Sequence, residues 1–258
     1  MERAKERQFS RLLMQWDKEK NRRSMPWKGE KDPYKIWLSE IILQQTRVEQ
    51  GLAYYNRFVQ QFPNIQHLAA ADDAAVFKLW EGLGYYSRCR NLIATARQIV
   101  NELNGIFPAS YESILNLKGI GPYTAAAIAS FAYNLPYAVV DGNVMRVLAR
   151  YFGIRQSISS TTGKNFFSTL ANQLLAGNDP AIFNQAIMDF GATVCKPQSP
   201  LCSGCSLHKH CTAFKDKLTD SLPVKEFKLK KKQRWFYYAV IEYKGATYIH
   251  KRTQKDIW

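Results

Sequence analysis

The sequence lacks any run of about 18 apolar residues, so it offers no candidate for a membrane-spanning helix. Its first residues, MERAKERQFSRLLMQW, mix charged and apolar side chains and do not form the apolar core of a secretory signal peptide. Acidic residues are also scarce, because 21 Asp and Glu stand against 36 Lys and Arg, for a net charge of +15. We therefore expect a cytoplasmic protein of bacterial type that contacts no membrane and binds an anionic partner, most often nucleic acid.

Strand patterns are nearly absent from residues 1–213, which we predict to be mainly α-helical. Apolar residues recur there at spacings of three and four, and proline or glycine separates the segments. One short strand is predicted at 137–140 (YAVV), and there is no repeat of fixed period. The predicted helices are 6–20, 34–46, 48–61, 72–80, 86–103, 110–117, 122–133, 143–153, 163–176 and 180–193.

The composition changes after residue 213. The segment VKEFKLKKK (224–232) holds five lysines and one glutamate, and we predict a basic linker over 214–233. The next segment, RWFYYAVIEYKGATYIHKR, is aromatic and β-branched with Lys-Gly at 244–245, which predicts a β-hairpin. Because two strands alone are marginally stable in water, we interpret 234–258 as the incomplete start of a second, β-rich domain.

Cysteine is sparse, with five in the chain, yet four of them fall within seventeen residues. Cys195, Cys202, Cys205 and Cys211 have the spacing C-x6-C-x2-C-x5-C, so their thiolates can surround one metal centre. Thiols stay reduced in the cytoplasm, which argues against disulfides. The spacing differs from the paired C-x2-C of a zinc ribbon, and four cysteines suit an iron–sulfur cluster, with zinc as the alternative. Cys89 stands alone in a predicted helix and is expected to be a buried, small apolar residue.

The segment LKGIGPYTA (117–125) joins two predicted helices through glycine and proline. Gly119 and Gly121 allow a sharp backbone turn, and Pro122 suits the first position of the next helix. The N–H groups at the start of that helix would then point at an anion, for which a DNA phosphate is the natural candidate. An ordinary connection between two helices is the alternative interpretation.

Two carboxyl groups are expected in different settings. Glu40 lies in the predicted helix 34–46, which is apolar nearly all round and should be buried. Its carboxyl group is therefore either paired or kept partly protonated by desolvation. Asp141 in VVDGN precedes a helix, so it is either a simple N-cap or an aspartate held ionised at a helix N-terminus. One acid and one anion are what cleavage of a glycosidic bond requires.

These motifs together resemble the endonuclease III superfamily of DNA glycosylases. The resemblance rests on LKGIGPYTA, VVDGN and the four-cysteine loop, and it covers about residues 8–213. Within that superfamily, PWKGEKDPYKIWLSEIILQQTRV and WEGLGYYSRCRNL are similar to the adenine DNA glycosylase (MutY-type) family. The resemblance implies a helical domain of two lobes over 1–213 with the active site between them, and a [4Fe–4S] cluster on the four cysteines. It also implies that a monomer removes adenine mispaired with 8-oxoguanine or guanine in double-stranded DNA.

The resemblance further implies roles for single residues. Glu40 would be the general acid that protonates adenine N7, and Asp141 would stabilise or trap the sugar cation. Asn143 would hydrogen-bond near Asp141, and Tyr123 would lie against the reacting sugar. The implied DNA-binding residues are Gln45, Thr46, Tyr85, Gly119 and Gly121, and the implied adenine-pocket residues are Arg23 and Trp27.

Two of the DNA-binding residues, Gln45 and Tyr85, would wedge into the base stack while the target base is flipped out. For Tyr85 and Trp27 the alternative is that each packs in a hydrophobic core. Lys28 stands where the family often has arginine, and lysine lacks the bidentate geometry of arginine, so Lys28 is left out of the catalytic set.

Tyr123 bears on the type of reaction. Members of the superfamily that also cut the strand place a lysine there, whose amine forms a Schiff base with the sugar. A phenol cannot form that imine, so the prediction is base removal without a strong lyase step. One alternative is a thymine-mismatch or bifunctional pyrimidine glycosylase, and Glu40 together with the absence of lysine at 123 argues against it. The other is a non-catalytic iron–sulfur DNA-binding protein, which would need neither Glu40 nor Asp141.

The last residues resemble the first strands of the family's Nudix-like domain, which helps to recognise 8-oxoguanine. Because the chain ends at Trp258, we expect it to keep the chemistry and to lose part of its preference for the oxidised partner base.

Overall fold

The computed structural model describes residues 2–226 and 233–249. Contacts between residues divide the chain into two units, Met1–Glu226 and Phe227–Trp258. The first unit is helical, and its elements are α1 (Glu2–Lys20), α2 (Pro33–Leu43), α3 (Val48–Gln61), α4 (Ile65–Ala70), α5 (Asp73–Trp80), α6 (Tyr86–Glu102), α7 (Tyr111–Leu115), α8 (Pro122–Tyr133), α9 (Gly142–Phe152), α10 (Thr161–Leu175), α11 (Pro180–Thr193), the 3-10 helix η1 (His208–His210) and α12 (Thr212–Lys215).

All ten predicted helices are present, and the prediction of a mainly α-helical fold is confirmed. The periodicity did not indicate the short elements α4, η1 and α12, because three to six residues are too few to display a repeat of 3.6. Helix α2 ends at Leu43, three residues before its predicted end, because Gln45 adopts a left-handed backbone with φ of 56°. Among the described residues no helix is both long enough and apolar enough to span a membrane.

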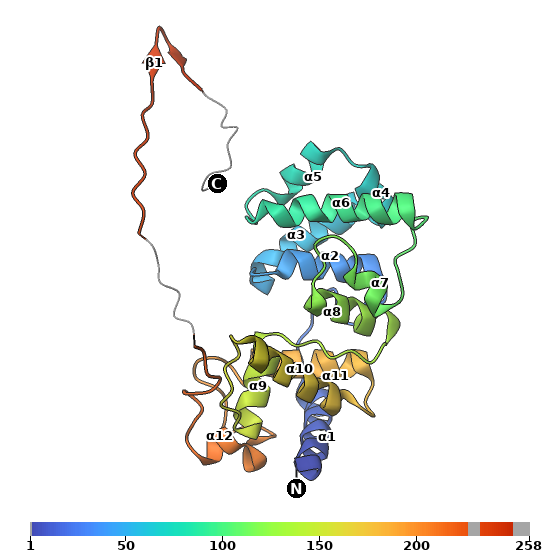
Figure 1. Cartoon of the computed structure of the whole chain (residues 1–258), viewed down its shortest axis with the longest axis vertical. Coiled ribbons are helices and arrows are strands. Elements are labelled where there is room, and N and C mark those ends of the chain that lie inside the picture. Colours follow the sequence, from blue (N-terminus) through green and yellow to red (C-terminus); the bar gives the residue numbers. More distant parts are fainter. Residues whose placement is uncertain (1, 227–232, 250–258) are drawn as a thin grey trace. The chain divides into compact units, whose positions relative to one another are not determined.

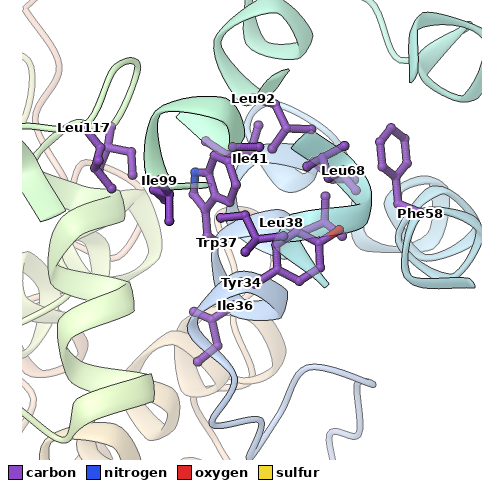
Figure 2. Packing of buried hydrophobic residues seen from close by; sticks show 14 of the residues in the cluster. Tyr34, Ile36, Trp37, Leu38, Ile41, Phe58, Leu68, Leu92, Ile99 and Leu117 are labelled. Atoms are coloured by element: carbon purple, nitrogen blue, oxygen red, sulfur yellow. The ribbon is translucent and has the colours of Figure 1, made fainter. Parts of the chain in front are cut away.

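Two hydrophobic cores divide the first unit into two lobes. The first core belongs to α2–α8, and Figure 2 shows the fully buried Trp37 at its centre among leucine and isoleucine side chains. The second core belongs to α1 and α9–α11. Although α1 is first in the sequence, it packs in the second lobe (Figure 1). There the Phe9 and Tyr151 rings lie 4.9 Å apart between centroids. The chain therefore crosses between the lobes twice, once through residues 21–32 and once after α8.

The strand predicted at 137–140 is wrong, because this extended segment has no partner strand. Side chains satisfy its backbone instead. Asn172 Oδ1 accepts from the N–H of Ala138 at 3.0 Å, and Asn184 Oδ1 accepts from the N–H of Val139 at 3.0 Å. Asn184 Nδ2 also donates to the Tyr137 carbonyl at 2.9 Å. The segment leads from the first lobe directly to Asp141.

The second unit contains the predicted β-hairpin, which is confirmed. Strands β1 (Glu242–Tyr243) and β2 (Ala246–Thr247) are antiparallel, with Glu242 opposite Thr247. Lys244 and Gly245 form the turn with φ angles of 50° and 76°, as a two-residue hairpin requires. Of the predicted basic linker and β domain, residues 227–232 and 250–258 lie outside the described residues.

Part of the segment expected as linker contacts the helical unit. The carbonyl of Leu222 accepts from Arg150 Nε at 3.0 Å, and the carbonyl of Val224 accepts from the N–H of Ile158 at 3.0 Å. These two contacts attach residues 222–224 to the second lobe.

Candidate active site

A cavity of about 990 Å³ lies where the two lobes meet. Its walls come from residues 23–31, α2, the turn after α2, the first turn of α8, the start of α9, and α11. Eight of the residues singled out from the sequence line it, namely Arg23, Trp27, Glu40, Gln45, Thr46, Tyr123, Asp141 and Asn143. Tyr85, Gly119 and Gly121 do not line it.

Glu40 projects into the cavity from α2, a helix buried on most of its surface. Burial raises the pKa of its carboxyl group to about 7, and the negative charge of Asp141 adds to the rise. A hydrogen bond from the Tyr123 hydroxyl acts in the opposite direction and lowers the same pKa. Near neutral pH this carboxyl group is therefore partly protonated. Of the two settings considered from the sequence, a paired carboxylate or a desolvated and partly protonated group, the structure agrees with the second.

Asp141 is the N-cap of α9, so the simple structural role considered from the sequence is present. Its Oδ1 accepts from the N–H of Val144 at 2.7 Å, and its Oδ2 accepts from Asn143 Nδ2 at 2.6 Å. Asn143 is held in turn by Arg146, whose Nη2 donates to Asn143 Oδ1 at 2.8 Å. A carboxylate fixed at a helix N-terminus by two donors is a stable anion. Because Asp141 also lines the cavity, the N-cap and a chemical role are compatible.

Tyr123 occupies the first turn of α8, where it follows the glycine-containing hairpin. Burial and the nearby carboxyl groups of Glu40 and Asp141 raise the pKa of its phenol well above the usual value. The phenol is therefore a neutral donor at the base of the cavity. Its hydroxyl hydrogen-bonds to Glu40, and it lines the same cavity as both carboxyl groups.

The hairpin itself leaves the start of α8 accessible. Gly119 has a φ of 75°, and a Cβ atom there would lie 2.7 Å from Asn91, so a side chain is excluded on two grounds. Gly121 is the N-cap and has no side chain to occupy the first N–H groups of the helix. Gly121 and Pro122 are both exposed. This end of α8 can therefore accept an anion from solution.

One wall of the cavity is organised by a residue that the sequence interpretation missed. Asp189 is fully buried on α11, and its two oxygens accept from Arg23 Nη1 and Lys28 Nζ, each at 2.9 Å. Asn21 and Gln185 donate to it as well, also at 2.9 Å each. Gln185 and Lys28 line the cavity beside Arg23. A signal was present, since Gln185 and Asp189 interrupt an apolar helix at a spacing of four.

Trp27 packs against the first core and also faces the cavity. Its ring meets that of Tyr55 edge to face at 5.2 Å between centroids. Trp27 therefore packs in the core and lines the pocket at the same time.

Two turns with strained backbone lie at the edge of the site. Gln45 and Tyr85 both have left-handed φ angles, of 56° and 47°. Tyr85 is 61% exposed, so it is not a core residue. Left-handed backbone is rare for residues other than glycine and is often found at functional sites.

The four clustered cysteines line a second, separate cavity in the second lobe, beside Arg150. Arg150 Nη1 lies 3.5 Å from Cys195 Sγ, and the N–H of Leu207 lies 3.4 Å from Cys205 Sγ. Burial raises the pKa of Cys205 to about 11, so a metal would have to displace its proton. Among the described residues, no group of three or more Cys, His, Asp or Glu side chains stands at metal-binding spacing. Four thiols on one cavity are nevertheless the donor set of a four-thiolate centre. Cys89 is fully buried and apart from this group, as predicted.

Residues 38–171 match the model of the HhH-GPD superfamily of base excision DNA repair proteins. The adenine DNA glycosylase of Buchnera aphidicola subsp. Schizaphis graminum is 37% identical over 252 residues, which cover 97% of this chain and 72% of that protein. The chain belongs to the adenine DNA glycosylase family. The human adenine DNA glycosylase is 44% identical over 211 residues, covering 78% of this chain and 38% of the human one.

Solved structures of other DNA glycosylases share the fold of this chain. A thermostable thymine-DNA glycosylase superposes with a TM-score of 0.74 at 28% identity, covering 83% of this chain and 98% of the other. An endonuclease III in a non-covalent complex with DNA superposes with a TM-score of 0.70, at 20% identity and the same coverage, which shows the shared fold. As a member of the family, the chain is a base excision repair glycosylase.

Proposed function

We propose that this glycosylase hydrolyses the N-glycosidic bond of adenine paired with 8-oxoguanine or guanine in double-stranded DNA, without a strong strand-cutting step. The relatives named adenine DNA glycosylase support adenine as the base. The observation that carries the proposal is the arrangement of two carboxyl groups in one cavity. Glu40 has a pKa raised to about 7, whereas the carboxylate of Asp141 is fixed by two hydrogen bonds at the start of α9.

The two groups divide the reaction between them. Protonated Glu40 gives its proton to N7 of adenine, and the electron pair of the C1′–N9 bond leaves with the base. The sugar becomes an oxocarbenium ion, which the Asp141 carboxylate stabilises as an ion pair or captures as a covalent ester. Water then forms a bond to C1′ and gives its second proton to the Glu40 carboxylate, which yields an abasic site and restores the acid; where an ester has formed, its C1′–O bond to Asp141 breaks in this step. Asn143 holds Asp141 by the 2.6 Å hydrogen bond, so it is a positioning residue for this step.

Tyr123 limits the reaction to base removal. A Schiff base with the sugar needs a nucleophilic amine, and at position 123 the cavity that holds both carboxyl groups presents a neutral phenol instead. No imine forms there, so the strand is cut only after later treatment with alkali.

DNA binds across the exposed ends of the same elements. The uncapped start of α8 at Gly121 is proposed to hold a phosphate, which fixes the register of the duplex. Gln45 and Tyr85 are proposed to enter the base stack, with Thr46 beside them, while adenine turns into the pocket walled by Arg23 and Trp27.

The cluster of cysteines is proposed to hold a [4Fe–4S] centre through Cys195, Cys202, Cys205 and Cys211. Such a centre would order the loop 195–211 in the second lobe. The four thiols share one cavity, which supports a common ligand set. Iron and acid-labile sulfide at about four each per chain would support the cluster. Stoichiometric zinc without sulfide would contradict it.

The activity is tested by single-turnover reactions on three duplexes, with A opposite 8-oxoguanine, A opposite guanine, and T opposite guanine. Each sample is divided into portions with and without alkali before strand analysis. We expect breaks at adenine only after alkali. Release of thymine alone would favour a thymine-mismatch glycosylase, and binding without release from any duplex would favour a non-catalytic DNA-binding protein.

The residue roles are tested with Glu40→Gln and Asp141→Asn in the same assay. Each variant preserves size and removes the acid or the charge. A role in transition-state protonation or charge stabilisation is worth about 100-fold or more in rate. If both variants released adenine at the unmodified rate, the assignment of the two carboxyl groups would be wrong.

A further inference from the structure

Arg88, near the start of α6, connects two turns that are far apart in the sequence. Its Nη1 donates to the carbonyl oxygens of Ile41 at 2.8 Å, Ile42 at 3.2 Å and Gln44 at 2.6 Å, at the C-terminal end of α2. Its Nη2 donates to the carbonyl oxygen of Leu83 at 3.4 Å, in the turn before α6. One guanidinium therefore fixes both turns relative to each other.

The two turns are those that carry Gln45 and Tyr85. Each residue has the left-handed backbone, which is unfavourable for a residue with a side chain. Such a conformation persists only where the surroundings enforce it. The Arg88 guanidinium lies 5.5 Å from the centroid of the Tyr85 ring and 5.2 Å from that of the buried Trp80 ring. Arg88 thus contacts the Tyr85 side chain directly and holds the carbonyl that precedes Gln45.

The contact is specific to arginine in its chemistry. Among the described residues Arg88 takes part in no ion pair, so backbone carbonyls and aromatic rings are its partners. Carbonyl groups at a helix C-terminus carry partial negative charge and favour a cation. The planar guanidinium presents several donors in fixed directions, whereas a lysine ammonium is a compact point charge. A lysine at this position would keep the charge and lose the simultaneous hold on both turns.

We propose that Arg88 is a positioning residue for base extrusion, because it fixes the separation and orientation of Gln45 and Tyr85. The inference rests on the proposed function, in which these two side chains enter the base stack. A preset pair avoids the cost of ordering two loose turns when DNA binds. Arg88 itself touches neither the substrate base nor the reacting sugar in this proposal.

The test compares Arg88→Lys and Arg88→Met with Arg97→Met, a matched control on the same helix. Arg97 also ties α6 to backbone carbonyls, since it donates to Ala69 at 3.3 Å and to Ala71 at 3.2 Å. Base extrusion is measured in a Glu40→Gln background by the fluorescence of 2-aminopurine placed at the target adenine. Adenine release is measured in the active enzyme under single-turnover conditions, with pH profiles and melting temperatures for every variant.

We expect both Arg88 variants to lower extrusion and the single-turnover rate by about tenfold, the effect of about 1.4 kcal/mol. The midpoint of the pH profile should stay at the wild-type value, because Glu40 is unaltered. Arg97→Met should lower the melting temperature and leave extrusion unchanged. In double-mutant cycles, the effect of Arg88→Met should largely disappear once Tyr85 or Gln45 is replaced by alanine.

Two results would overturn the inference while leaving the proposed function intact. One is normal extrusion in both Arg88 variants when Tyr85→Ala impairs it. The other is an Arg88→Met effect that adds fully to those of Tyr85→Ala and Gln45→Ala. Failure of the wild-type protein to release adenine would instead overturn the proposed function and this inference with it.

Discussion

The pH dependence of adenine release tests the central feature of the site, the protonated state of Glu40. Burial and the charge of Asp141 raise the pKa of Glu40 to about 7, from an ordinary value of 4.5. A general acid acts in its protonated form, so the rate should be highest below this pKa and decline as the pH rises through it. With a pKa of about 7, about 90% of the group is protonated at pH 6 and about 10% at pH 8.

The single-turnover rate at saturating enzyme should therefore fall about tenfold between pH 6 and pH 8. The assay follows release from a duplex with A opposite 8-oxoguanine at constant ionic strength. A flat profile from pH 6 to 9, or a decline centred near the ordinary glutamate value of 4.5, would refute the assignment of Glu40 as a buried acid.

The Tyr123→Phe variant should shift the midpoint of this pH profile in a predictable direction. The Tyr123 hydroxyl hydrogen-bonds to Glu40 and lowers its pKa, so loss of the hydroxyl should move the midpoint to higher pH. Tyr111→Phe is a matched control, because Tyr111 is a tyrosine of α7 outside the cavity lining. A downward shift in Tyr123→Phe, or an equal shift in both variants, would contradict the contact.

The same pKa predicts how stability varies with pH. The folded state favours neutral Glu40, so the stability linked to it is fully present below about pH 4.5 and declines as the pH rises through about 7. Glu40→Gln avoids this loss and should gain stability over the wild type as the pH rises, by at most about 3 kcal/mol at pH 8. Urea unfolding at pH 5 and pH 8 measures the difference, and an equal difference at both pH values would count against a buried acid.

Further predictions concern the hairpin, the buried aspartate and the cysteines. Gly119→Ala should weaken DNA binding at least tenfold and lower the free energy of unfolding by about 1–3 kcal/mol. Gly177→Ala is the control, because Gly177 also has positive φ but open space around it, and this variant should lose only stability. Titration of labelled duplex measures DNA binding, and urea unfolding measures stability. Asp189→Asn leaves Arg23 and Lys28 without their anion and should lower the free energy of unfolding by about 3–5 kcal/mol. A loss under about 1 kcal/mol would show that this network does not stabilise the fold. Cys205→Ser should reduce the bound iron and the melting temperature. Cys89→Ala, at a buried cysteine outside the group, should keep the iron content of the wild type. Equal iron contents in the two variants would contradict the ligand assignment.

Local signals in the sequence were sufficient for most of the fold. Apolar spacing located ten of the helices, and the Lys-Gly pair located the hairpin turn. The strand predicted at 137–140 was wrong because four β-prone residues have no strand character without a partner, and here Asn172 and Asn184 bind their backbone. The early end of α2 was also not predicted: Gln45 adopts a left-handed backbone there, and Arg88 from another segment binds the carbonyl oxygens of this turn.

By itself the sequence identified the two carboxyl groups of the proposed reaction and their local settings. Glu40 in an apolar helix and Asp141 before a helix indicated one buried acid and one anion, because burial and capping follow from neighbouring residues. Tertiary structure alone decided that these groups, 101 positions apart, share one cavity with Tyr123. It also decided that Asp189 anchors Arg23 and that Arg88 joins the two strained turns. The reason is physical: helical periodicity specifies which face of a helix is buried, and only packing between the lobes specifies what that face meets.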